Sequence, residues 1–183
     1  MAVSNDAGIV EVIERRRIAV VSPGTPGALQ PYHFAKNLEL GEAKKFLANC
    51  SASSTRLAES SVRNVIEELR GRQYRIEGAA VLLASGRPLP ALANILASHP
   101  LIHTAEGIFF RQAFSTACET LSLSVTGIRE RDLGESLRKA FGQATPRIQK
   151  HISTLGRSLG PPWTTDQKTA TLGALLVLAG MPH

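Results

Sequence analysis

The stretch that decides the expected fold is Arg17-Ile18-Ala19-Val20-Val21-Ser22-Pro23-Gly24-Thr25. Its first half is a continuous apolar run rich in β-branched residues, which favours a buried strand over a helix. The Pro-Gly pair that follows requires a turn. The sequence therefore predicts a strand over residues 18–21 that ends at Ser22.

Predicted helices and strands alternate along the rest of the chain. Helical spacing of apolar residues predicts one long helical region from Gly41 to about Arg72, and Ser51–Ser54 is a point at which it could divide into two helices. Residues 1–16 are expected to form a short amphipathic helix or arm, and Tyr32–Leu40 an irregular or edge strand. Further strands are predicted over 75–85 and 123–128, and further helices over 91–97, 102–121, 133–141, 145–156 and 165–179.

This order predicts a single α/β domain of 183 residues with a small, partly parallel sheet flanked by helices. No apolar run reaches the length of about 18 residues that spans a membrane, and the first residues lack the pattern of a signal peptide. The two cysteines, Cys50 and Cys118, form no CxxC motif. We therefore expect a reduced, cytoplasmic protein without a membrane role.

Three stretches carry a resemblance to a known family. The first is the strand and turn at 17–25. The second is the order helix, strand, helix, strand between Arg56 and Ile128. The third is Leu137–Gly142, a lysine-containing helix with a glycine turn, followed by the helix at 144–150. Together they resemble the RuvC-type Holliday-junction resolvases, and the likeness, which spans residues 17–180, implies a ribonuclease H-like fold.

The resemblance implies a site from which most of the chemistry is missing. The family holds two Mg²⁺ ions with four carboxylates. The likeness places the first carboxylate position at Ser22 and the last two at Asp166 and Thr169, and the strand at 79–85 holds no acid for the second. One carboxylate cannot hold two metal ions, so we expect no cofactor, with Mg²⁺ required only if nuclease activity survives.

A second arrangement uses residues outside this pattern. His103 and Glu106 are three residues apart near a predicted helix start, so they share a face. As a metal pair they need at least one more ligand, and Glu106 has the simpler role of complementing the helix dipole. We therefore expect no metal site. A hydrolase in which Ser22, His103 and Glu106 converge is kept as an alternative.

The charge of the chain favours an anionic partner. The net charge is +6, and clustered cations release counterions from a phosphate backbone. Two of the cations follow the third predicted strand, on the side where α/β folds place ligands. These observations predict a nucleic-acid-binding face, with a solvated surface as the simpler alternative. Its members are Arg129, Arg131, Arg138, Lys139, Arg147 and Lys150.

Two functions from different classes follow. The first is a catalytically degraded RuvC-like domain that binds branched DNA, RNA or a partner protein without cleaving it. The second is a structural or interaction protein, forming a homodimer, with no nucleic-acid role. The apolar helices predicted at 102–121 and 172–179 offer surfaces for such pairing.

Overall fold

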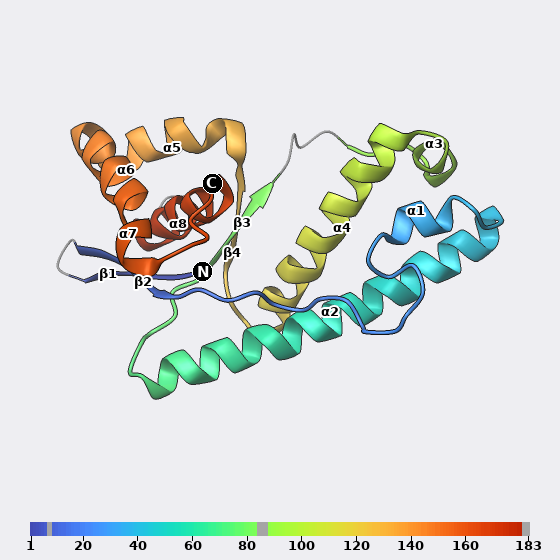
Figure 1. Cartoon of the computed structure of the whole chain (residues 1–183), viewed down its shortest axis with the longest axis horizontal. Helices are drawn as coiled ribbons and strands as arrows, with labels where there is room; N and C mark the ends of the chain where they lie inside the picture. Colours follow the sequence, from blue (N-terminus) through green and yellow to red (C-terminus); the bar gives the residue numbers. More distant parts are fainter. Residues whose placement is uncertain (7–8, 84–87, 181–183) are drawn as a thin grey trace. The chain divides into compact units, whose positions relative to one another are not determined.

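The computed structural model describes residues 1–6, 9–83 and 88–180, and the chain divides into two compact units (Figure 1). Unit 1 comprises Met1–Arg17, Glu77–Ser85 and Ser124–His183. Unit 2 comprises Ile18–Ile76 and Gly86–Leu123. Length and composition predict one domain, whereas the structure assembles each unit from segments that are far apart in the sequence.

Unit 1 begins with an antiparallel pair, β1 (Ala2–Asp6) and β2 (Ile9–Glu14), so the helix predicted over residues 1–16 is wrong. The reason lies in β2, where β-branched residues flank Glu11 and favour a pleated strand. Val12 lies opposite Val3 in the register. Val10 is buried and packs in a cluster with Ile152 and Leu175.

A second pair of strands in unit 1 is parallel. β3 (Ala79–Leu83) and β4 (Val125–Arg129) pair from Ala79 opposite Val125 to Leu83 opposite Arg129. The protein is therefore a mixed α/β structure with a small parallel pair of strands, as the sequence predicts, and this pair forms a sheet separate from that of β1 and β2. The finer expectation of a ribonuclease H-like fold stays a prediction. The end of the strand predicted over 75–85 lies outside the described residues.

The helices of unit 1 follow β4 in sequence. They are the short 3₁₀ turn η1 (Glu130–Asp132), α5 (Leu133–Phe141), η2 (Gly142–Ala144), α6 (Thr145–Thr154), α7 (Gly156–Leu159) and α8 (Thr165–Leu178). Neighbouring residues of α8 fill two core clusters: Leu176 packs with Ile128 and Leu137, and Leu175 with Val10 and Ile152. α8 is thus the central helix of this unit. Its N-cap is Thr164, whose N–H donates to Gln167 Oε1 at 2.8 Å.

The strand predicted over residues 18–21 is absent. These residues have no regular secondary structure and are half-buried or exposed. They belong to unit 2, whose described residues form helices and loops, while all four strands that the structure assigns lie in unit 1. An apolar run needs a partner strand to form a ladder, and Ile18–Val21 has none within its own unit.

Unit 2 contains α1 (Pro31–Ala35), α2 (Leu40–Gly71), α3 (Leu92–Leu96) and α4 (His99–Thr120). The long helix α2 runs without a break through Ser51–Ser54, and it packs against α4 (Figure 1). Small buried side chains allow the helices to approach closely: Ala43, Ala58, Ala105 and Ala117 are at most 1% exposed.

The edge strand expected within Tyr32–Leu40 is replaced by α1 and the turn that connects it to the start of α2 at Leu40. Pro31 stands at the first turn of α1, where its fixed φ suits a helix and its missing N–H costs nothing. Both Pro31 and Ala35 are buried. Across the residues that the structure describes, no helix combines the length and apolar character needed to span a membrane.

Candidate metal site

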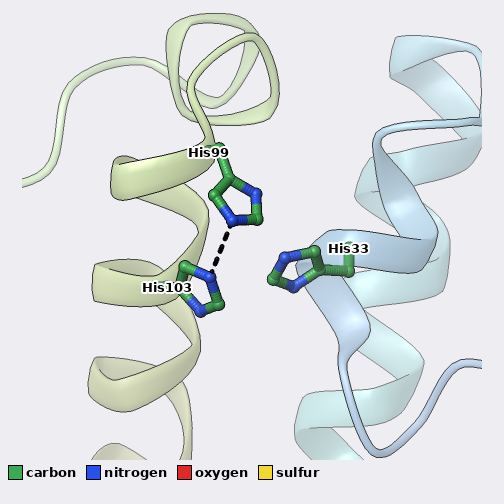
Figure 2. Close-up of side chains that lie close together, drawn as sticks. All are labelled: His33, His99 and His103. Atoms are coloured by element: carbon green, nitrogen blue, oxygen red, sulfur yellow. Dashed lines mark hydrogen bonds between the residues drawn. The ribbon is translucent and has the colours of Figure 1, made fainter.

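Two helices of unit 2 bring three histidines together. His33 comes from α1, and His99 and His103 come from α4 (Figure 2). A ring nitrogen from each lies within 4.8 Å of those of the other two. His33 is half-buried, whereas the two α4 histidines are exposed. Within the described residues, this group of side chains has the donor atoms and spacing of a candidate metal site.

The first two turns of α4 supply two of the rings. Residues four apart lie on one face of a helix, so His99 and His103 stand one above the other. Their Nε2 atoms are 3.0 Å apart, which makes one ring the donor and the other the acceptor of a hydrogen bond (Figure 2). The helix predicted over 102–121 includes His103 but begins three residues after His99, so the sequence pattern does not pair the two histidines. In the structure, Pro100 stands at the start of α4.

Glu106, one turn further along α4, holds the third ring. Its Oε1 lies 3.0 Å from His33 Nδ1 and also accepts the His33 backbone N–H at 3.2 Å. A carboxylate only accepts hydrogen bonds, so this contact favours a proton on Nδ1 of His33. The tautomer that carries its proton on Nδ1 has a free lone pair on Nε2, and this is the form of histidine that binds a metal through Nε2.

The three rings fit the donor set of a transition metal. Zinc binds imidazole nitrogen at about 2.0–2.1 Å, so ligand nitrogens in a tetrahedral site are about 3.4 Å apart. The Nε2 atoms of His99 and His103 are already near that spacing. The His33 ring centroid is 4.7 Å from that of His103 and 5.2 Å from that of His99. All three ring nitrogens lie within 4.8 Å of one another, compared with the spacing of about 3.4 Å in a tetrahedral zinc site.

The short helix that carries His33 is fixed by its neighbours. Tyr32 packs edge-on against Phe109 of α4, with ring centroids 6.2 Å apart. Burial raises the pKa of the Tyr32 hydroxyl, and the negative charge of Glu106 raises it further. Tyr32 therefore stays neutral at physiological pH and acts as a packing residue beside the histidines.

The residues of the predicted nuclease site fall into different units. Ser22 lies in unit 2, in a turn where its carbonyl accepts the Thr25 N–H at 3.4 Å. Asp166 is an exposed acid in the first turn of α8 in unit 1. Thr169 donates its hydroxyl to Thr165 at 2.8 Å. The strand expected to end at Ser22 is absent, whereas the assignment of Ser22 to a carboxylate position stays a prediction of the resemblance.

The alternative hydrolase site was expected to join Ser22, His103 and Glu106, but these residues make other contacts. His103 bonds to His99 and Glu106 bonds to His33, and Ser22 takes part in neither contact. His103 and Glu106 lie one turn apart on α4, and each contacts a histidine. Their partners are two further histidines rather than a serine.

All six predicted nucleic-acid-binding residues lie in unit 1, and all are exposed. Three of them are in ion pairs: Arg129 and Arg131 share Asp132, and Lys139 binds Glu135 at 2.9 Å. The Lys139 ammonium lowers the pKa of Glu135. The remaining three are Arg138, Arg147 and Lys150. Neighbouring carboxylates thus offset part of the positive charge that a phosphate backbone would meet.

Comparisons of the chain with protein-family models, with curated proteins and with solved structures find no match. The resemblance to the resolvases, the binding of DNA or RNA and the homodimer accordingly stay predictions.

Proposed function

We propose that unit 2 binds a divalent transition-metal ion through His33, His99 and His103, with Glu106 orienting His33. The observation that carries this proposal is the meeting of three imidazoles from two helices, with ring nitrogens within 4.8 Å of one another. It replaces the expectation of a chain without a metal site.

The carboxylate behind His33 supports a metal rather than a chance grouping of rings. Histidines that bind metals commonly donate their second ring N–H to a carboxylate, which fixes the ring and makes the ligand nitrogen more basic. Glu106 is in this position, and its side chain is only 12% exposed. Taking a carboxylate largely out of water costs free energy. That cost has a purpose if the ring that Glu106 orients is a metal ligand, whereas a solvated surface would not require it.

The chemistry of the donors selects the class of metal. Imidazole nitrogen suits zinc, copper, nickel and cobalt, whereas Mg²⁺ and Ca²⁺ prefer oxygen ligands. The group contains three nitrogens and no carboxylate among its ligands. The Mg²⁺ that the resolvase resemblance implies is therefore a poor match for this site, and zinc is the metal that we propose.

Such a metal would also join α1 to α4. α1 is only five residues long, and its histidine and Glu106 are its polar link to α4 among the contacts described. An ion that binds the folded chain and not the unfolded chain stabilises it by about 2.7 kcal/mol at a hundredfold excess over Kd. The metal would thereby hold α1 against α4 and stabilise this end of unit 2.

The test is a zinc titration of the tag-free protein in competition with a chromophoric chelator. We expect one tight zinc ion per chain. We expect His33→Gln, His99→Gln and His103→Gln each to weaken binding by at least tenfold while the far-ultraviolet circular dichroism stays unchanged. The matched control is His151→Gln, because His151 lies in unit 1 and its Nε2 donates to the Val10 carbonyl at 3.1 Å.

Two results would contradict the proposal. One is a zinc affinity in the wild-type chain no greater than that of the triple His→Gln variant. The other is an equal loss of affinity in the His151→Gln control, which would assign the binding to scattered surface histidines.

A further inference from the structure

We infer that the metal site is open: its fourth coordination position takes hydroxide or a small anion from solvent. This inference rests on the proposed function, because it concerns the same three histidines. It assigns the site to the class that binds an exchangeable ligand and not to the class of closed structural centres.

The site offers three donor side chains among the described residues, one fewer than a closed tetrahedral site needs. Structural zinc sites are closed by four protein ligands, whereas sites with three protein ligands keep a fourth position for water or substrate. The group formed by His33, His99 and His103 includes no fourth histidine, cysteine or acid within the described part of the chain. A tetrahedral metal held here keeps one position for a ligand from outside.

Glu106 does not fill that position. Its Oε1 is already engaged by both the Nδ1–H and the backbone N–H of His33. The two nitrogens of an imidazole point away from each other, so a carboxylate on Nδ1 lies on the side of the ring opposite a metal on Nε2. Glu106 therefore orients a ligand and leaves the metal accessible.

The exposure of two histidines and the positive charge at the site determine which ligand can bind the metal. His99 and His103 are exposed, so a solvent ion can reach the metal between them. Three neutral imidazoles leave the ion with its full positive charge. His99 is also the first residue of the 22-residue helix α4, whose N-terminal end carries a partial positive charge. The charge of the metal ion and the partial charge of the helix end both favour an anion over a neutral ligand. Metal-assisted hydrolysis requires such a position, because metal-bound hydroxide is its nucleophile.

The test uses the whole chain loaded with Co²⁺, which reports its coordination by visible absorption. Azide is the coordinating anion, and perchlorate at the same ionic strength is the non-coordinating control. We expect azide to shift the Co²⁺ bands in a saturable way that dialysis reverses, and we expect perchlorate to leave them unchanged. His151→Gln should behave as the wild type does.

The possible outcomes distinguish the open coordination position from metal binding itself. Intense four-coordinate Co²⁺ bands that azide does not alter would overturn the open site and leave the metal site standing. Weak bands identical to those of the His103→Gln variant would mean that no metal binds at the histidines, so the proposed function itself would fail. Equal shifts with azide and perchlorate would also overturn the inference, because they would report ionic strength alone.

Discussion

Glu106 binds His33 twice through one oxygen atom: Oε1 accepts the His33 backbone N–H at 3.2 Å and lies 3.0 Å from Nδ1 of the same residue. A single carboxylate of α4 thus sets both the position of α1 and the orientation of the ring that α1 carries. The backbone contact fixes the helix, and the ring contact fixes the nitrogen that faces the other histidines.

Glu106→Gln is expected to weaken zinc binding by about 10- to 100-fold, the range found when the carboxylate partner of a metal-bound histidine is changed. The amide still accepts a hydrogen bond, but it no longer makes the ring more basic. Chelator competition measures the change. Glu59→Gln is the control, since Glu59 lies on α2 and pairs with Arg63 at 2.6 Å. Equal affinities in the wild-type and Glu106→Gln proteins would remove Glu106 from the site.

Metal selectivity gives a second prediction. Thermal unfolding should shift upward with Cu²⁺, Zn²⁺ or Ni²⁺ in small molar excess, and should not respond to Mg²⁺ or Ca²⁺ at the same concentration. Removal of the ion with a chelator should reverse the shift. A stabilisation by Mg²⁺ that persists in the His99→Gln variant would point instead to an oxygen-ligand site elsewhere in the chain.

Arg15→Ala is expected to destabilise unit 1 by about 2–3 kcal/mol, the cost of removing a charged donor from several carbonyls. The Arg15 guanidinium donates to the carbonyls of Leu159, Gly160 and Pro162 at 3.0, 3.0 and 2.7 Å. Denaturant unfolding measures the loss. Arg15→Lys should recover only part of the stability, because an ammonium lacks the planar fork. Arg17→Ala is the exposed control, and an equal loss there would contradict the role assigned to Arg15.

Two glycines of unit 1 should respond oppositely to alanine. At Gly173 in α8 an added Cβ meets Ala80 and Leu82 at 3.5 Å, an ordinary contact, so Gly173→Ala should stabilise the helix by about 0.5–1 kcal/mol. At Gly78 the Cβ would lie 3.0 Å from the Ser124 carbonyl oxygen, which accepts the Ala79 N–H. Gly78→Ala should therefore cost about 1–3 kcal/mol. Denaturant midpoints of both variants test the contrast, and a shared sign would contradict it.

Alkaline pH should destabilise unit 2 through its two buried thiols. Burial raises the pKa of Cys50 and of Cys118, and Glu119 adds to the effect at Cys118. Below the ordinary value of 9.0 both the folded and unfolded chains keep these protons. Above it the unfolded thiols ionise while the folded ones resist, so the free energy of unfolding falls as pH rises.

Urea unfolding under reducing conditions between neutral pH and about 10 measures this slope. The double variant Cys50→Ala, Cys118→Ala is the comparison, and it should lose less stability over the same range. An identical slope in the two proteins would assign the alkaline loss to other groups, of which Tyr32 is the first candidate because its pKa is also raised.

Local patterns in the sequence predict much of the helical structure. The helix expected over 133–141 has the observed bounds of α5, and the long helix and the last helix are each within one or two residues of theirs. These segments combine apolar periodicity with a clear start or stop signal, so neighbouring residues decide their structure.

The errors occur where distant contacts decide the structure. Residues 1–16 have apolar residues that fit either period, and Val10 becomes a strand residue because Ile152 and Leu175 bury it. The run at 18–21 has strand character but lies in a unit without a partner strand. For the site, His103 and Glu106 could be paired by spacing, whereas His33 is 66 residues from His99 in sequence and only the packing of α1 on α4 brings them together.

The β1–β2 pair is made early in synthesis, but the residues that it packs against are made late. Its apolar residues pack on α6 and α8, and Arg15 is bound by carbonyls at 159–162, near the other end of the chain. A ribosome adds about 5–20 residues per second, so the hairpin emerges several seconds before the segments that cover it. Unit 2, whose last segment ends at Leu123, is therefore complete in sequence while unit 1 still lacks the helices that cover its first two strands.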